Sequence, residues 1–196
     1  MTEPVLLQTR DLRKAYPGVV ALGGVSIAFR AGEVHALIGK NGAGKSTFVK
    51  ILTGAVQPSA GQVLLAGKPV SLRSPRVALQ RGIAAVYQEL SLAPDLTVAE
   101  NILLGHPPMR WGGFVVDARK LAETAAGLLG EMGVRLAPGR KVRELGMAEQ
   151  QVVEIAKAMS RRPDVLLLDE PTSALAQEEV SGLFGLLRRL ASRGVA

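Results

Sequence analysis

The sequence predicts an α/β fold with a central, largely parallel sheet. Apolar runs that suit strands alternate with segments of helical periodicity, as in proteins whose parallel strands are joined by helices. The most apolar run, Val165–Leu168, has four consecutive apolar residues and suits a strand covered on both faces. The composition, 47% hydrophobic and 21% charged over 196 residues, is that of a globular chain able to bury a core.

The expected strands lie mostly in the first half of the chain. They are Val5–Leu7, Val25–Phe29, Val34–Ile38, Val63–Ala66, Val70–Leu72, Ile83–Tyr87 and Val165–Leu168. The letters A-G-K-P at 66–69 are a turn signal between two of these strands. The expected helices are Lys45–Leu52, Pro75–Gln80, Val98–Leu104, Ala118–Met132, Ala148–Ser160 and Gln177–Ala191.

Residues 89–142 differ from the rest because they are rich in helix and are broken by the loop H-P-P-M-R-W-G-G at 106–113. We expect one domain over 1–196, with 1–88 and 143–196 as the core and 89–142 as an inserted helical subdomain. Gly194 is a suitable end for the last helix, and Val195–Ala196 resembles the start of another strand. We therefore expect a fragment of a longer protein, truncated at its C-terminal end.

Composition excludes several functional classes. The chain has no cysteine and only two histidines, which argues against disulfides and against thiolate or histidine metal sites. We find no secretory signal and no apolar run of the roughly 18 residues that a membrane span needs, so we expect a soluble, cytoplasmic protein. The net charge of +7 comes from scattered Lys and Arg, which indicates a solvated basic surface and no nucleic-acid partner.

A glycine-rich segment between an expected strand and an expected helix predicts a phosphate-binding loop. Residues 39–47 read G-K-N-G-A-G-K-S-T and fit the pattern G-x-x-x-x-G-K-[ST]. Glycines let successive N–H groups face one centre, and the helix N-terminus adds its dipole. We expect Lys45 to reach the β and γ phosphates of ATP and the Ser46 hydroxyl to hold Mg²⁺. The expected phosphate contacts are Gly39, Lys40, Asn41, Gly42, Ala43, Gly44, Lys45, Ser46 and Thr47.

Two acidic residues follow the most apolar strand, in the letters V-L-L-L-D-E at 165–170. Ligands of open α/β sheets bind beyond the carboxyl ends of the strands, where these residues are expected. Asp169 is then suited to bind Mg²⁺ through water, and Glu170 to polarise an attacking water. An acidic pair after a strand could also cap the next element, and only its combination with the phosphate loop favours the functional interpretation.

Four motifs in order carry a family resemblance: G-K-N-G-A-G-K-S-T, V-Y-Q-E-L at 86–90, E-L-G-M-A-E-Q-Q-V-V-E-I-A-K-A at 144–158 and L-L-L-D-E-P-T-S-A-L at 166–175. The chain resembles an ATP-binding cassette ATPase, and more narrowly the N-terminal cassette of tandem-cassette importers of bacterial monosaccharides. The resemblance implies a P-loop NTPase fold with an antiparallel β subdomain and an inserted helical subdomain. It also implies that a second cassette, transmembrane permease subunits and, indirectly, a periplasmic sugar-binding protein are partners, and that the chain lies on the inner face of the membrane.

The resemblance also assigns residue roles. Tyr16 falls where an aromatic ring stacks on adenine; the alternative is an ordinary surface or core tyrosine. Gln88 falls where a glutamine joins Mg²⁺ and water, which makes it both a catalytic and a metal-binding candidate beside Lys45 and Glu170. The signature segment, expected to bind the γ-phosphate held by a second cassette, corresponds to Gly146, Met147, Ala148 and Glu149.

The sequence departs from the family at several positions. Gly146 stands where serine is usual, Ala176 where aspartate is usual, and Lys40 where glutamate is usual. The switch histidine expected after the next strand has no counterpart within residues 1–196. These departures leave open an alternative, a module that dimerises with ATP without efficient turnover. A further alternative, a DNA-repair or translation factor, would require salt-dependent nucleic-acid binding.

Overall fold

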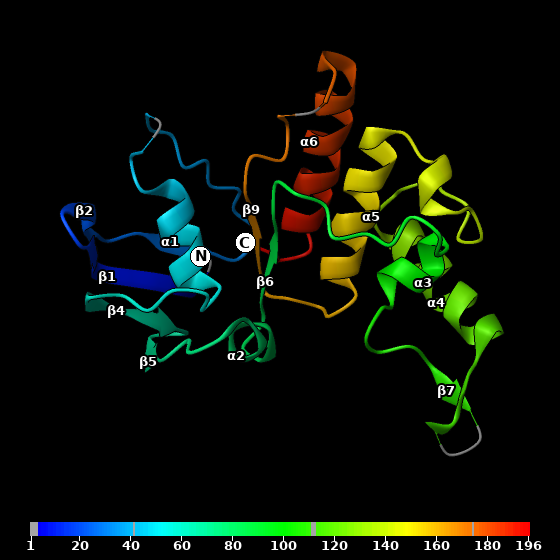
Figure 1. Ribbon diagram of the computed structural model, residues 1–196, viewed down its shortest axis with the longest axis horizontal. Helices are drawn as coiled ribbons and strands as arrows, with labels where there is room; N and C mark the ends of the chain where they lie inside the picture. The colour runs from blue at the N-terminus through cyan, green and yellow to red at the C-terminus, as the bar shows by residue number, and fades with distance from the viewer. Residues whose placement is uncertain (1–3, 41, 111–112, 174) are drawn as a thin grey trace. The chain divides into compact units, whose positions relative to one another are not determined.

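The computed structural model describes residues 4–40, 42–110, 113–173 and 175–196 (Figure 1). The chain forms two units. The first contains residues 1–85, 163–169 and 190–196, and the second contains residues 86–162 and 170–189.

The first unit is built on an antiparallel sheet with the strand order β2-β1-β4-β5, and β3 also pairs with β1. The turn predicted at 66–69 joins two of these strands in register, with Val63 opposite Val70. The predicted strand over 25–29 is instead split, because β2 ends at Val25 and β3 begins at Ala28. The strands are β1 (Val5–Tyr16), β2 (Val19–Val25), β3 (Ala28–Arg30), β4 (Ala60–Leu65) and β5 (Lys68–Val70).

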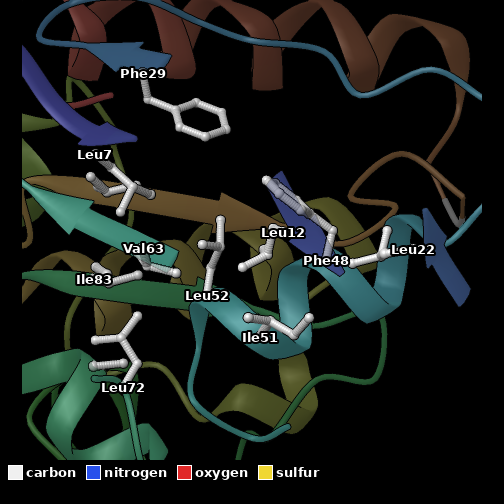
Figure 2. Packing of buried hydrophobic residues seen from close by; sticks show 12 residues of the cluster. Leu7, Leu12, Leu22, Phe29, Phe48, Ile51, Leu52, Val63, Leu72 and Ile83 are labelled. Carbon is white, nitrogen blue, oxygen red and sulfur yellow. The ribbon is translucent and has the colours of Figure 1, made fainter. Parts of the chain in front are cut away.

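The core of the first unit lies where this sheet meets helix α1 (Lys45–Leu52). Figure 2 shows Ile51 and Leu52 of that helix beside Leu12 of β1, and all three side chains are fully buried. The apolar residues of α1 are spaced so that one face enters the core, and Lys50 remains exposed on the other. Helix α2 (Pro75–Gln80) and the two-stranded sheet of β6 (Ile83–Val86) and β9 (Val165–Leu168) complete this unit.

The predicted strand Val34–Ile38 is wrong. This segment has no regular structure, and Val34 and Ile38 are 59% and 94% exposed. Among the described residues, no backbone hydrogen bond joins it to a neighbouring strand. A strand exists only as part of a ladder, so apolar, β-branched residues without a partner strand do not form one.

The chain's last residues pair with β9. The Ala196 N–H donates to the Asp164 carbonyl at 3.0 Å, and the Leu166 N–H donates to the Ala196 carbonyl at 2.8 Å. These two bonds bracket Val165, which is the pattern that parallel strands make. The prediction that Val195–Ala196 begins a strand agrees with this pairing, and Gly194 has the positive φ expected after a helix.

The second unit is mainly helical. Helices α3 (Val98–Ile102), α4 (Ala118–Glu131) and α5 (Met147–Met159) pack on one another, and most of α6 (Gln177–Ala191) belongs to the same unit. A short 3₁₀ helix, Val142–Glu144, precedes α5. The predicted loop at 106–113 contains part of a small hairpin, β7 (Met109–Arg110) paired with β8 (Val115–Val116). In the described parts of both units, no helix is long and apolar enough to cross a bilayer.

Candidate functional site

The predicted site residues divide between the two units. The phosphate loop, Tyr16 and Asp169 belong to the first unit. Gln88, Glu170 and residues 146–149 belong to the second. Asn41, a predicted phosphate contact, lies outside the described residues.

The phosphate loop leads into α1 through a glycine that no other residue can replace without strain. Gly44 is the N-cap of α1 and has a φ of 89°, in the left-handed region. A Cβ atom there would overlap the Ala21 carbonyl and come within 2.8 Å of Leu22 Cδ2. Among the residues that the structure describes, no side chain caps α1, and the first turn of the helix has no acidic residue. The first N–H groups of the helix therefore remain available to an anion.

Lys45 holds its ammonium group over the loop. Its Nζ donates to the carbonyl oxygens of Gly39 at 2.8 Å and Lys40 at 3.2 Å. The Lys40 carbonyl also accepts from the Ala43 N–H at 3.1 Å, which closes a turn within the loop. The cation is thus fixed beside the uncapped helix end, where it reinforces attraction for phosphate.

Ser46 and Asp169 offer the oxygen ligands that Mg²⁺ prefers. Among the described residues, neither side chain is engaged in a hydrogen bond or ion pair, so both retain their capacity for a metal or its water ligands. Thr47 follows in the first turn of α1 and is half-buried. The donor set is chemically suited to a magnesium ion that keeps several waters.

Tyr16 ends β1 with its side chain partly open to solvent, and the residue is 41% exposed. Lys14 Nζ lies 5.0 Å from the centroid of the tyrosine ring. This cation–π contact orients the ring and leaves it accessible for stacking on a planar ligand.

In the second unit, Gln88 and Glu170 line the same small pocket, whose volume is about 20 Å³. A pocket of this size holds about one water molecule when polar groups line it. Gln88, Gln151, Glu170 and Ser173 are the polar residues of its lining. The other lining residues are Leu90, Met147, Pro171 and Leu175.

Glu170 has a strained backbone, with a φ of 48°. A non-glycine residue in this region costs about 1–2 kcal/mol, and such residues concentrate at functional sites. The Ser173 N–H and the Ser173 hydroxyl both donate to the Glu170 carbonyl, at 3.2 and 3.1 Å. Ser173, which sequence reasoning did not single out, therefore holds the carboxylate-bearing residue in place.

The N-terminus of α5 is closed by its own glutamate. Gly146 is the N-cap, and its N–H donates to Glu149 Oε2 at 3.2 Å. The guanidinium of Arg140 donates two hydrogen bonds to the same carboxylate, from Nη1 to Oε1 at 2.7 Å and from Nη2 to Oε2 at 3.2 Å. Met147 lines the small pocket, whereas Ala148 and Glu149 line a larger, mainly apolar pocket of about 270 Å³ beside α6. No local pattern in the sequence indicates the Arg140 contact, because Arg140 lies in the loop before α5 and Glu149 lies in the helix.

The phosphate loop with Lys45 at its end is typical of nucleotide-binding proteins of the phosphate-loop class. Comparisons with known proteins identify the family within that class. A family model described as ABC transporter matches residues 22–173. The chain belongs to the ABC transporter family.

Relatives of the same family are similar over nearly the whole chain. The chain is 50% identical over 97% of its length to the ribose import ATP-binding protein RbsA 1 of Rubrobacter xylanophilus, and equally so to that of Streptomyces avermitilis. It spans only 38% and 36% of those two relatives. A crystal structure of the ADP conformation of an ATP-binding cassette of an ABC transporter has a TM-score of 0.84 and 27% identity, covering 97% of this chain and 78% of that one.

Proposed function

We propose that the chain is an ATP-binding cassette that hydrolyses MgATP and so powers the import of a monosaccharide through a membrane permease. The names of its relatives, ribose import ATP-binding proteins, support the substrate class and the coupling to import. The observation that carries the proposal is the uncapped end of α1 with the Lys45 ammonium fixed beside it.

The first unit binds the nucleotide. Lys45 and the loop N–H groups stabilise the negative charge on the β and γ phosphates, and the Tyr16 ring stacks on adenine. Ser46 and Asp169 would hold Mg²⁺, and the family resemblance adds Gln88 as a further ligand. Bound Mg²⁺ would neutralise phosphate charge and orient the γ-phosphoryl group.

The second unit supplies the residues that act on water. Gln88 orients a water molecule, and the Glu170 carboxylate accepts its proton as the water oxygen attacks the γ-phosphorus. The bond between the γ-phosphorus and the β–γ bridging oxygen breaks, and ADP and phosphate leave. The small pocket that Gln88 and Glu170 share supports these roles.

Two cassettes are required for a complete site. The N-terminus of α5, from Gly146 to Glu149, contacts the γ-phosphate held by the second cassette. A mostly parallel core over 1–88 and 143–196, an antiparallel β subdomain and a helical subdomain over 89–142 form the cassette. The helical subdomain contacts the permease, which places the chain on the cytoplasmic face of the membrane. A periplasmic sugar-binding protein delivers the sugar to the other face.

The test is MgATP hydrolysis measured against protein concentration, with Glu170→Gln as the inactive variant. Glu178→Gln, an exposed glutamate in the first turn of α6, is the matched control. A rate that rises faster than linearly with concentration, is lost in Glu170→Gln and is kept in Glu178→Gln supports the proposal. A parent rate equal to that of Glu170→Gln excludes hydrolysis by this chain.

A second candidate function is a nucleotide-gated module that dimerises with ATP without efficient turnover. The observation in its favour is at Gly146, which has no hydroxyl to offer phosphate and whose N–H is already bonded to Glu149. ATP-dependent dimerisation without phosphate release in both the parent and Glu170→Gln is the result that favours this alternative.

A further inference from the structure

A polar cluster built around one buried carboxylate joins α5 to the segment that follows Gln88. It consists of exposed Ser91, buried Glu154 and half-buried Lys157, and the proposed function assigns none of them a role. Glu154 is only 7% exposed. Carboxylates are almost never buried without partners, and the partners of Glu154 are Ser91 and Lys157.

Ser91 is held through both its side chain and its main chain. Its hydroxyl donates to Glu154 Oε1 at 2.6 Å and accepts from Lys157 Nζ at 2.8 Å, while its carbonyl accepts from the same Nζ at 2.9 Å. Lys157 Nζ also lies 3.8 Å from Glu154 Oε1. Hydrogen bonds to charged groups are the strong ones, and Ser91 makes three of them.

Among the described residues, the second carboxylate oxygen of Glu154, Oε2, makes no hydrogen bond that could replace the contacts of Oε1 with Ser91 and Lys157. Glu154 Oε2 is buried and has no hydrogen-bond partner within the described part of the chain. Oε1, with its contacts to Ser91 and Lys157, is therefore the only oxygen through which the described residues satisfy this charge. Such a carboxylate holds its partners firmly, because losing them leaves a buried charge unpaired.

The cluster lies on the face of α5 that also lines the small pocket. Met147 and Gln151 line that pocket, and Glu154 follows them at helical spacing on the same face. Gln88 and Leu90 line the pocket from the other segment. Three residue steps span at most about 10 Å, so fixing Ser91 restricts the positions that Gln88 can take.

We propose that Glu154 and Lys157 are positioning residues that hold Ser91 on α5 and thereby keep Gln88 beside Glu170. The inference rests on the proposed function, in which Gln88 orients the attacking water. Neither residue touches the reacting atoms; they act through Ser91. A displacement of about 1 Å at such a site lowers the rate by up to about 100-fold.

The experiment measures kcat and KM for MgATP in the full chain. Ser91→Ala is expected to lower kcat by on the order of 10-fold or more and to leave KM unchanged, because nucleotide binding depends on the phosphate loop. Ser91→Thr is expected to restore kcat, since it keeps the hydroxyl and Ser91 is exposed enough to accommodate a methyl group. Lys157→Met should resemble Ser91→Ala. Glu123→Gln, which removes an exposed ion pair on α4, is the control and should behave as the parent.

A Ser91→Ala variant with the parent's kcat overturns the inference, as does a Ser91→Thr variant that stays as slow as Ser91→Ala. A parent chain that hydrolyses no more ATP than Glu170→Gln overturns the proposed function instead, and the inference with it. The two failures are distinguished by the activity of the parent.

Discussion

Lys45 is the residue on whose charge we expect nucleotide binding to depend most. We expect Lys45→Ala to weaken ATP binding by about 10- to 100-fold, because hydrogen bonds to charged groups contribute about 1.5–3 kcal/mol. Nucleotide titration measures the effect. Lys50→Ala is the matched control, since Lys50 is an exposed lysine in the last turn of the same helix. Equal losses in the two variants would mean that general positive charge, not this position, attracts the nucleotide.

Gly146 is the residue at which the two candidate functions differ. Its φ is −68° and an added Cβ meets no atom within 4 Å, so serine fits without strain. Gly146→Ser is expected to raise the hydrolysis rate about 10-fold by adding a hydroxyl donor for the γ-phosphate. Gly139→Ser, at an equally open position, is the control. No gain in Gly146→Ser would show that the missing hydroxyl does not limit turnover.

At the scale of elements, α3 depends on its N-terminal cap. Thr97 Oγ1 accepts from the Glu100 N–H at 3.2 Å, and Glu100 Oε2 accepts from the Thr97 N–H at 2.7 Å. We expect Thr97→Ala to lower the free energy of unfolding by about 1 kcal/mol, measured by urea denaturation. Thr124→Ala, which removes an exposed hydroxyl on α4, should change it by less than about 0.5 kcal/mol. Similar losses in both variants would contradict the capping role.

A histidine beside the C-terminal end of α5 is expected to make the free energy of unfolding depend on pH. His106 Nε2 lies 3.1 Å from the hydroxyl of Ser160, the C-cap of α5. Burial, with a smaller contribution from the charge of Arg161, lowers the pKa of His106 below 6.5. The unfolded chain therefore takes up this proton at a higher pH than the folded chain, and the free energy of unfolding falls as the pH drops through 6.5.

The measurement is urea unfolding at a series of pH values on both sides of 6.5. His106→Asn is expected to flatten this part of the profile. Glu100 acts in a separate, more acidic range, because hydrogen bonds from the Thr97 backbone and side chain lower its pKa below 4.5. A parent and a His106→Asn variant with the same slope near pH 6.5 would refute the assignment.

At the scale of the whole molecule, the exposed segment 34–38 is expected to promote self-association. It combines apolar side chains with backbone groups that no strand in the described part of the chain pairs, and such segments are templates for intermolecular pairing. Ile38→Lys should reduce the growth of light scattering with protein concentration. Val20→Lys is the control, since Val20 is 72% exposed but lies in a strand already paired with β1. An equal reduction of light scattering in both variants would mean that surface hydrophobicity alone, and not the unpaired backbone of 34–38, drives self-association.

The sequence predicts local features of this molecule better than long-range ones. Helices α1, α2 and α6 and strand β9 have the predicted bounds, because periodicity and capping are encoded within each segment. The prediction of a strand at 34–38 was wrong because a strand needs a neighbouring strand to pair with, and composition does not reveal whether one is present. The β7–β8 hairpin was missed because two-residue strands show no alternation.

The same distinction applies to the candidate site. The phosphate loop could be predicted because its function depends on adjacent residues in one pattern. The contact of Ser91 with Glu154 joins residues 63 positions apart. A glutamate and a lysine within an otherwise apolar helical run were the only sign of it in the sequence, and they did not reveal the partner.

The contacts of Lys45 also bear on the entropy of binding. A lysine side chain carries about 2 kcal/mol of rotamer entropy, which is lost when the ammonium group is held in one place. Here the loop carbonyls of Gly39 and Lys40 already restrict that side chain. An arriving phosphate therefore meets a cation whose freedom was reduced during folding, and less of its contact energy is consumed in ordering the protein.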